Sequence, residues 1–131
     1  MAEDTPFEVL VVEGEALLRM TAYDAISSAG TVAREAGDAA EALQILTDHP
    51  EVGLLFTDVN LPGGMCGITL SHHVHGECAE MEFILTSGAQ TVSSPDLRNH
   101  GTFLPKPYSD TALMTIVWRK CGYWQRRSRP S

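Results

Sequence analysis

Cysteine is scarce in this 131-residue chain, and its three copies, Cys66, Cys78 and Cys121, do not fall at a Cys-x-x-Cys spacing. An odd number without that spacing argues against a disulfide framework and against a structural zinc site. Long apolar runs are also absent, since none approaches the roughly 20 residues of a membrane-spanning helix. The N-terminus, Met1–Asp4, is acidic and has the wrong charge for a signal peptide. We therefore expect a cytoplasmic protein that is not anchored in a membrane.

Basic residues are nearly missing from the first 118 positions, which hold all seventeen acidic residues but only four basic ones. The last thirteen residues hold five basic residues and no acidic one. The formal net charge of -8 is therefore that of an acidic domain with a basic end. Direct nucleic-acid binding needs a basic footprint, so this distribution argues against it.

The length is that of one compact domain, and an apolar fraction of 44% is enough to build a core. We expect an N-terminal extension over residues 1–6, one domain over 7–122 and a basic tail over 123–131. Within the tail, Arg126–Ser131 has the composition of a disordered end. The tail has three interpretations: a solvated end, a linker to an output domain, or a docking segment for an acidic partner. Too few residues follow the last expected helix for a DNA-binding domain, so we expect output through protein contacts.

Short apolar runs alternate with helical patterns along the whole chain. Runs of β-branched and aromatic residues predict strands, and apolar residues spaced three or four apart predict helices. The expected strands lie at residues 9–12, 31–36, 53–57, 83–86 and 102–106. The expected helices lie at residues 18–29, 39–46 with Asp38 as the N-cap, 67–74, within 91–99, and 113–124.

Five strands that alternate with five helices predict an α/β fold with parallel pairing through right-handed crossovers. The strand with Arg34 and Glu35 and the strand with Pro105 are the least suited to burial, because charges need solvent and proline cannot donate to the ladder. Placing these two at the edges gives a doubly wound five-stranded sheet in the order 2-1-3-4-5. Ligands of such sheets bind outside the carboxyl ends of the strands, where the strand order reverses.

Polar residues end four of the expected strands: Glu13 the first, Asp58 the third, Thr86 the fourth and Lys106 the fifth. Each of them alone has a structural interpretation as a turn residue, a cap or a solvated charge. Their convergence at one edge of the sheet favours a functional site. Carboxylates bind Mg²⁺ and attack phosphorus, and a hydroxyl and an ammonium group stabilise phosphoryl oxygens.

Four motifs, in this order and spacing, resemble the receiver domain of bacterial two-component response regulators. The motifs are Val9–Glu13, Leu55–Gly63, Leu85–Gly88 and Phe103–Tyr108, and the resemblance covers residues 7–120. It implies the flavodoxin-like form of the fold expected above.

The resemblance also implies roles for individual residues. Asp58 would accept a phosphoryl group from a phosphohistidine on a sensor histidine kinase or a phosphotransfer protein. Lys106 would then pair with the phosphoryl group, and Thr86 would move its hydroxyl towards it. Phe103 matches the aromatic switch position, and the Lys106–Pro107 bond is expected to be cis.

In the family, Mg²⁺ is held by the acceptor carboxylate, an acid after the first strand and a carbonyl two residues past the acceptor; here these are Asp58, Glu13 and Asn60. Receivers normally have two adjacent acids after the first strand, and the second is the direct metal ligand. This chain has Gly14 at that second position. Losing a charged ligand is expected to weaken Mg²⁺ binding. Glu15 is a candidate substitute whose direction the sequence leaves open.

We therefore expect a stand-alone receiver, monomeric or weakly dimeric, that switches a protein partner through a population shift between two conformations. Gly14 leaves three interpretations: a phosphorylatable receiver with weakened Mg²⁺ binding, a degenerate receiver that acts as a phosphorylation-independent interaction module, or an incidental change. An enzyme such as a metal-dependent phosphohydrolase is disfavoured, because Asn60 stands where such enzymes use a second acid. Any hydrolysis would be slow self-dephosphorylation.

Two further groups of residues have competing interpretations. His72, His73 and His75 form either a polar helix face or part of a metal site, and we favour the polar face because no acid or cysteine at ligand spacing completes a site. The aromatic residues at 118, 123 and 124 form either a docking patch or the cover of the last helix.

Overall fold

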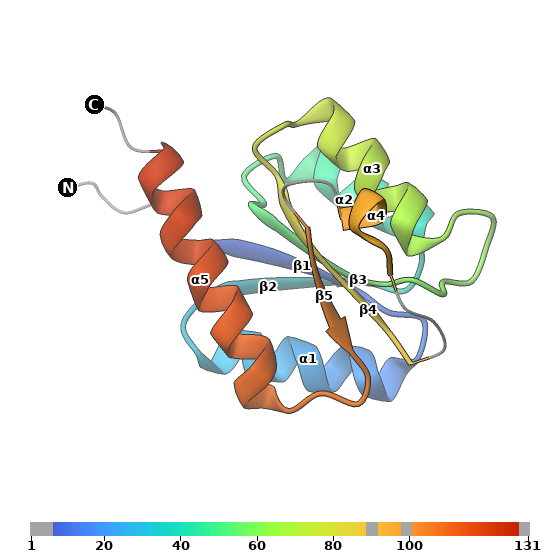
Figure 1. Ribbon diagram of the computed structural model, residues 1–131, viewed down its shortest axis with the longest axis horizontal. Coiled ribbons are helices and arrows are strands. Elements are labelled where there is room, and N and C mark those ends of the chain that lie inside the picture. Colours follow the sequence, from blue (N-terminus) through green and yellow to red (C-terminus); the bar gives the residue numbers. More distant parts are fainter. Residues whose placement is uncertain (1–6, 89–91, 98–100, 129–131) are drawn as a thin grey trace.

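The protein is described by a computed structural model over residues 7–88, 92–97 and 101–128, with the backbone alone for 123–128. The expected extension over 1–6 and the last three residues of the expected tail lie outside the described residues. Figure 1 shows a central sheet with helices on both of its faces. The α/β fold class is therefore confirmed.

Five strands form one parallel sheet in the order β2-β1-β3-β4-β5, as the sequence predicts. The strand bounds are β1 Glu8–Val12, β2 Val32–Ala36, β3 Leu54–Asp58, β4 Glu82–Ser87 and β5 Gly101–Pro105. The three inner strands are buried along their whole length, whereas β2 and β5 are partly exposed. The edge positions expected for the strands with Arg34 and Pro105 are confirmed.

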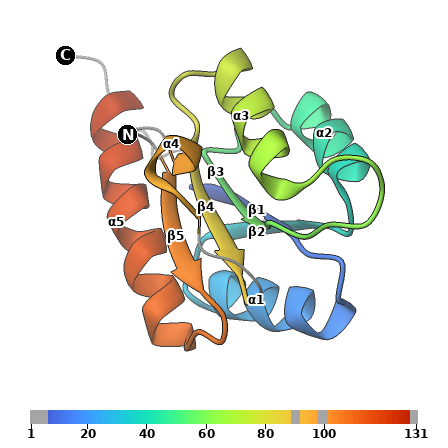
Figure 2. The same ribbon diagram turned by 45° about the vertical axis from the view of Figure 1, so that its right-hand side comes forward.

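Five helices connect the strands and cover the sheet. Their bounds are α1 Ala16–Ser28, α2 Ala39–Asp48, α3 Gly67–Glu77, α4 Ser94–Leu97 and α5 Asp110–Ser128. Figures 1 and 2 show α1 and α5 on one face of the sheet and α2, α3 and α4 on the other. Crossovers of opposite direction start from β1 and β3, so the edge between these two strands is the switch point at which ligands bind in this fold.

The alternation of side chains along β1 explains the two cores. Val9 and Val11 face α1 and α5, where they join a cluster with Ile26 of α1. Leu10 and Val12 face the opposite side and join a cluster that includes Leu70 of α3. All of these side chains are buried, and burying one side chain of this kind contributes roughly 1.5–3 kcal/mol. Two apolar faces thus hold the strands rigidly, and their carboxyl ends with them.

The predicted N-cap of α2 is confirmed. The Asp38 Oδ1 atom accepts a hydrogen bond from the Glu41 backbone N–H at 2.8 Å, and the Glu41 carboxylate accepts one from the Gly37 N–H at 2.8 Å. The pair resembles a capping box, except that Glu41 accepts from the residue before the N-cap. By contrast, the N-cap of α1, Glu15, has extended backbone angles and no capping bond from its side chain.

The C-terminal helix is longer than the sequence predicts. It runs to Ser128, so residues 126–128 of the segment expected to be disordered are helical. Arg126 and Arg127 lie within this helical stretch, and Pro130 follows in the sequence. Gly122 lies within this helix and does not end it.

Candidate functional site

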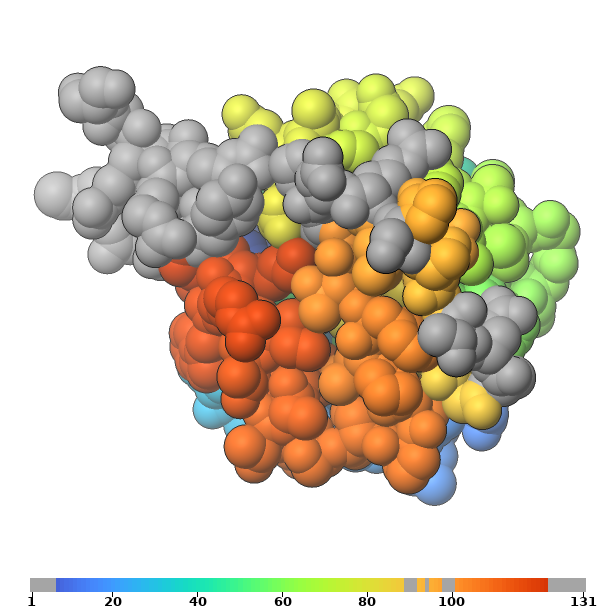
Figure 3. All heavy atoms as spheres, viewed as in Figure 1, coloured from blue at the N-terminus to red at the C-terminus, as the bar shows by residue number. Residues whose placement is uncertain are grey.

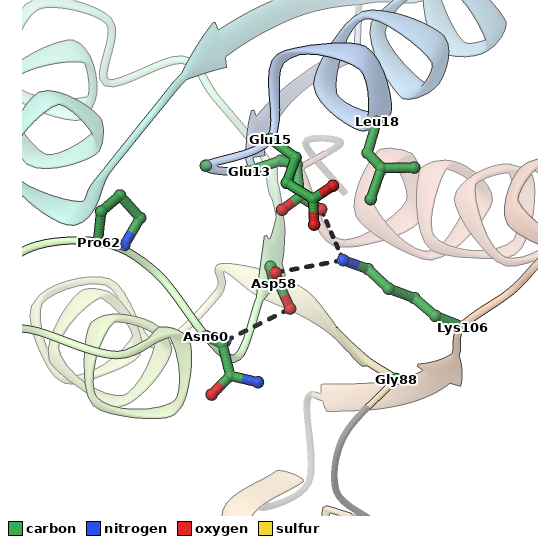
Figure 4. Close-up of a pocket in the computed structure, with 9 residues that line it drawn as sticks. Glu13, Glu15, Leu18, Asp58, Asn60, Pro62, Gly88 and Lys106 are labelled. Atoms are coloured by element: carbon green, nitrogen blue, oxygen red, sulfur yellow. Dashed lines mark hydrogen bonds and ion pairs between the residues drawn. The ribbon is translucent and has the colours of Figure 1, made fainter.

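A cleft of about 470 Å³ opens at the carboxyl ends of β1 and β3. It contains the acidic residues predicted from the sequence together with Lys106 (Figure 4). The lining residues are Glu13, Gly14, Glu15, Leu18, Asp58, Asn60, Pro62, Gly88 and Lys106. The predicted convergence of separate strand ends at the switch point is therefore what the structure has.

Lys106 joins the two predicted carboxylates. Its ammonium group donates to Glu13 Oε1 at 2.8 Å and to Asp58 Oδ2 at 3.2 Å. Burial on its own would lower the pKa of Lys106, but the hydrogen bonds and charges of Glu13 and Asp58 outweigh it and raise that pKa above its ordinary value. Lys106 is therefore a cation throughout the neutral range, held beside the expected acceptor.

The carboxylate of Glu13 lies in an electrostatically unfavourable environment. Burial raises the pKa of Glu13, the hydrogen bond from Lys106 opposes this, and the neighbouring Asp58 raises it further. The backbone of Glu13 is fixed on both sides: its N–H donates to Ala36 O at 3.0 Å, and its carbonyl accepts from Arg19 Nη1 at 2.8 Å. The chain thus holds an acid in a position that is electrostatically unfavourable in the absence of a further cation.

Arg19 was not predicted as a site residue. From α1 its guanidinium donates to the Glu13 carbonyl and, through Nε, to Glu35 Oε1 at 3.0 Å. It therefore ties the loop after β1 to the end of β2. Its position as one of four basic residues in the acidic part of the chain was the sequence signal that could have singled it out.

Asp58 is the last residue of β3 and is 7% exposed. Its second carboxylate oxygen, Oδ1, accepts a long hydrogen bond of 3.4 Å from the Asn60 backbone N–H. The carboxylate therefore faces the cleft, and its Oδ1 atom is only weakly hydrogen-bonded.

Thr86 lies directly across from Asp58 in the register of β3 and β4. It is 2% exposed, and its Oγ1 atom has no hydrogen-bond partner among the described residues. A buried hydroxyl without a partner costs about 1–3 kcal/mol, so such an atom calls for an explanation. A phosphoryl oxygen on Asp58 would supply the missing partner.

At Gly14, where an acid was expected, the loop after β3 packs closely against the backbone. A Cβ atom at Gly14 would lie 2.8 Å from Cδ and 3.3 Å from Cγ of Pro62, and 3.7 Å from the Gly37 carbonyl oxygen. The Pro62 ring, which belongs to the loop after β3, occupies the space that a side chain at position 14 needs. Gly14 thus lets the two loops of the cleft approach each other.

One expectation for β5 and the loop after it is tested by the structure. The Lys106–Pro107 peptide bond is cis, as expected. Tyr108 packs edge-on against Phe56 with the ring centroids 5.7 Å apart, and burial raises the pKa of Tyr108 to about 12, so its phenol stays protonated. Phe103, at the expected switch position, is half-buried on β5 beside Leu85 of β4 and packs against the core cluster on the α3 and α4 side.

The histidines of α3 lie away from the cleft and make individual contacts. His72 Nε2 is 2.7 Å from the Asp96 carbonyl oxygen, and His75 Nδ1 is 3.3 Å from that of Met81. Both rings lie edge-on to Phe83. Within the described ranges, no three histidine, cysteine or acidic side chains are grouped to hold a metal ion by themselves. The same ranges contain no helix long and apolar enough to cross a bilayer.

The donor set of the cleft can be tested against Mg²⁺, the ion that the fold family implies. Mg²⁺ takes oxygen ligands, keeps several waters and is usually held by one or two carboxylates. Glu13 and Asp58 provide two carboxylates, and the Asn60 main chain adjoins the Asp58 carboxylate. The residues therefore fit the ion chemically, with one charged ligand fewer than two adjacent acids would provide.

Comparison with known proteins assigns the class. The family model described as the response regulator receiver domain matches residues 9–117. The chain therefore belongs to this family, whose members are signalling domains of two-component systems. No curated protein matches the sequence.

Solved structures of receiver domains are similar to the chain. The receiver domain of the hybrid histidine kinase CckA is 30% identical with a TM-score of 0.75, over 86% of this chain and 97% of that one. The signal receiver domain of an HD domain-containing protein from Pseudomonas fluorescens Pf-5 is 25% identical with a TM-score of 0.83, over 93% and 99%. NtrX from Brucella abortus, at 24% identity and a TM-score of 0.84, aligns with 94% of this chain, which spans only 28% of NtrX.

Proposed function

We propose that the protein accepts a phosphoryl group on Asp58 and thereby switches a protein partner. The observation that carries this proposal is the position of three groups: the Asp58 carboxylate, the Lys106 ammonium at 3.2 Å and the unpartnered Thr86 hydroxyl in register with Asp58. The stand-alone character of the receiver stays a prediction from the sequence. Its place in the cytoplasm is also a proposal, supported by three free cysteines that suit a reducing compartment.

The proposed chemistry is a transfer between two residues. A carboxylate oxygen of Asp58 attacks the phosphorus of a phosphohistidine on a histidine kinase or phosphotransfer protein; the P–N bond breaks and the imidazole nitrogen leaves with the electron pair. Lys106, already charged and beside Asp58, compensates the negative charge of the new acyl phosphate. When bound at Glu13, Asp58 and Asn60, Mg²⁺ would neutralise charge on the phosphoryl oxygens.

The absence of a side chain at Gly14 supports weakened Mg²⁺ binding. Two carboxylates already share Lys106, and the space of a third is filled by Pro62. A cation bound here competes with Lys106 for the same oxygens and gains no charged ligand at position 14. We therefore propose a phosphorylatable receiver with a high Mg²⁺ requirement.

The switch would run through Thr86 and Phe103. Phosphorylation gives the Thr86 hydroxyl an acceptor on the Asp58 side, and its movement changes the packing against β5, where Phe103 is half-buried. Figure 3 shows β5 and the start of α5 as a continuous outer surface. Trp118 of α5 is 48% exposed. We propose this surface as the output face and α1, which exposes Leu17 and Met20 and contributes Leu18 to the cleft, as the face for the phosphodonor.

Mobility on a Phos-tag gel after incubation with acetyl phosphate tests the proposal. We expect a slower band that requires Mg²⁺ and disappears in Asp58→Asn. Thr111→Val, an exposed substitution at the start of α5, is the matched control and should label like the wild type. Labelling that persists in Asp58→Asn would contradict the assignment of the acceptor.

A degenerate receiver is the second candidate, and Gly14 is the observation that favours it. In that case the domain would bind its partner through the same output face without phosphate. Absence of labelling at any Mg²⁺ concentration, together with partner binding that Asp58→Asn leaves unchanged, would support this candidate. Enzymatic turnover of other phosphate esters is not expected, because Asn60 replaces the second acid that such chemistry uses.

A further inference from the structure

Position 14 is closed to an acid by packing. Any side chain at Gly14 must first displace the Pro62 ring, which lies 2.8 Å from the Cβ position. A charged group for the cleft must therefore come from a neighbouring position of the same loop. Glu15 is the next residue.

The environment of Glu15 leaves its carboxylate available. It is the N-cap of α1, and its backbone carbonyl accepts a hydrogen bond from the Arg19 N–H at 2.9 Å, but its side chain makes no capping bond and no hydrogen bond or ion pair with any described residue. It is nevertheless one of the residues that line the cleft. Figure 4 shows its side chain directed into the cleft, on the side where Glu13, Asp58 and Lys106 meet.

The charges of the cleft favour a cation. Glu13 and Asp58 share the single ammonium of Lys106, and Glu15 adds a third carboxylate. Arg19, on the first turn of α1, is bonded to the Glu13 carbonyl and to Glu35. The cleft therefore carries excess negative charge in a position open to a dissolved cation.

We propose that Glu15 partly replaces the missing acid at position 14 and provides a carboxylate to the Mg²⁺ site formed by Glu13 and Asp58. This inference rests on the proposed function. Glu15 lies one residue further along the chain than the usual ligand, and glutamate is one methylene longer than aspartate, so its reach compensates for its position. Because the side chain is exposed and unpartnered, it can turn to the ion without disturbing the core.

Binding of Mn²⁺ to the unphosphorylated full chain, followed by electron paramagnetic resonance of the free ion, tests this proposal without any reaction. Mn²⁺ serves as the probe for the Mg²⁺ site, and competition with Mg²⁺ shows that both occupy it. Glu15→Gln should lower the Mn²⁺ affinity at least about tenfold, since even a group that only supports a ligand contributes roughly 10- to 100-fold. Glu80→Gln, an exposed acid at the opposite end of the sheet, should bind like the wild type.

A third variant separates ligation from general charge. Glu15→Asp keeps the charge but shortens the reach, so ligation predicts a loss close to that of Glu15→Gln. Affinity equal to the wild type in either variant overturns the proposal, as does a wild type that binds no Mn²⁺. Labelling of Asp58 in the same wild-type sample is scored separately, so the receiver function can stand while the role of Glu15 fails, or the reverse.

Discussion

Two lysine–carboxylate pairs lie at opposite ends of the sheet and have the same separation. Lys106 is 2.8 Å from Glu13 at the carboxyl ends of the strands, and Lys120 of α5 is 2.8 Å from Glu82, the first residue of β4. The side chains of Lys120 and Glu82 are 10% and 4% exposed, and neither lines the cleft. Lys106 lies in the cleft and is shared with Asp58.

The difference shows that distance does not define the role of an ion pair. At the end with Lys120, the charges hold α5 onto the sheet and are shielded from water. At the end with Lys106, the acids outnumber the lysine and face an open cleft, so an incoming cation or phosphoryl group can change the arrangement. Substitutions at the first pair should therefore change folding, and substitutions at the second should change chemistry.

The largest effect is expected for Lys120→Met. Removing the ammonium leaves Glu82 buried without this partner, which should lower the free energy of unfolding by about 3–5 kcal/mol. Urea unfolding measures the change. The control Lys120→Met with Glu82→Leu should regain most of the loss, because an apolar pair of similar volume is often neutral. If Lys120→Met unfolds at the wild-type urea concentration, the pair does not have the structural role assigned here.

The next effect is expected for Lys106→Met, and it should appear in phosphorylation. Loss of a donor to a developing negative charge costs about 10²–10³-fold in rate. Stability should change by less than for Lys120→Met, since water in the cleft can solvate Glu13 and Asp58. The initial rate of acetyl phosphate labelling and urea unfolding measure both quantities. If Lys106→Met is labelled at the wild-type rate but is as destabilised as Lys120→Met, the two lysines have the same structural role and the distinction between the two pairs is wrong.

The sequence was sufficient to predict the sheet and the convergence of its polar ends. Apolar runs and helical spacing are local signals, and Pro105 and Arg34 identified the edges because they break a rule for buried strands. Once the order of the strands was known, the meeting of Glu13, Asp58, Thr86 and Lys106 followed from topology. The individual roles of these residues remain proposals.

Other parts of the site depend on contacts between loops, which no local pattern encodes. The Pro62 ring over Gly14 joins two segments nearly fifty residues apart in the chain, and Arg19 reaches the carbonyl rather than the side chain of Glu13. The sequence left the direction of the Glu15 side chain open, and Figure 4 shows it at the cleft. The helical continuation of α5 to Ser128 was missed because the composition of Arg126–Ser131 is that of a disordered end.

A moderate effect is expected from restoring an acid at the cleft. Gly14→Asp should strengthen Mg²⁺-dependent labelling only slightly on its own, because the new side chain must displace Pro62. Gly14→Asp with Pro62→Ala removes the two ring atoms nearest to the new Cβ and should lower the Mg²⁺ concentration for half-maximal labelling about tenfold. Pro62→Ala alone is the control. An equal gain from Gly14→Asp in both backgrounds would show that Pro62 does not restrict this position.

The smallest effect is expected for Glu13→Gln, and it should appear in thermal stability. Because burial raises the pKa of Glu13 in the folded chain, the ionised carboxylate costs stability at neutral pH, and this cost disappears below the ordinary glutamate pKa, where both states are protonated. Glu13→Gln should therefore raise the Tm slightly at pH 7, and the difference should shrink as the pH falls below that value. Glu82→Gln should instead lower the Tm at pH 7, because it weakens the buried bond to Lys120. Thermal unfolding followed by circular dichroism, at pH 7 and at a pH below the ordinary glutamate pKa, measures the contrast. A lower Tm for Glu13→Gln at pH 7 would mean that the bond from Lys106 to Glu13 outweighs the cost of burial. The carboxylates at both ends of the sheet would then stabilise the fold in the same way.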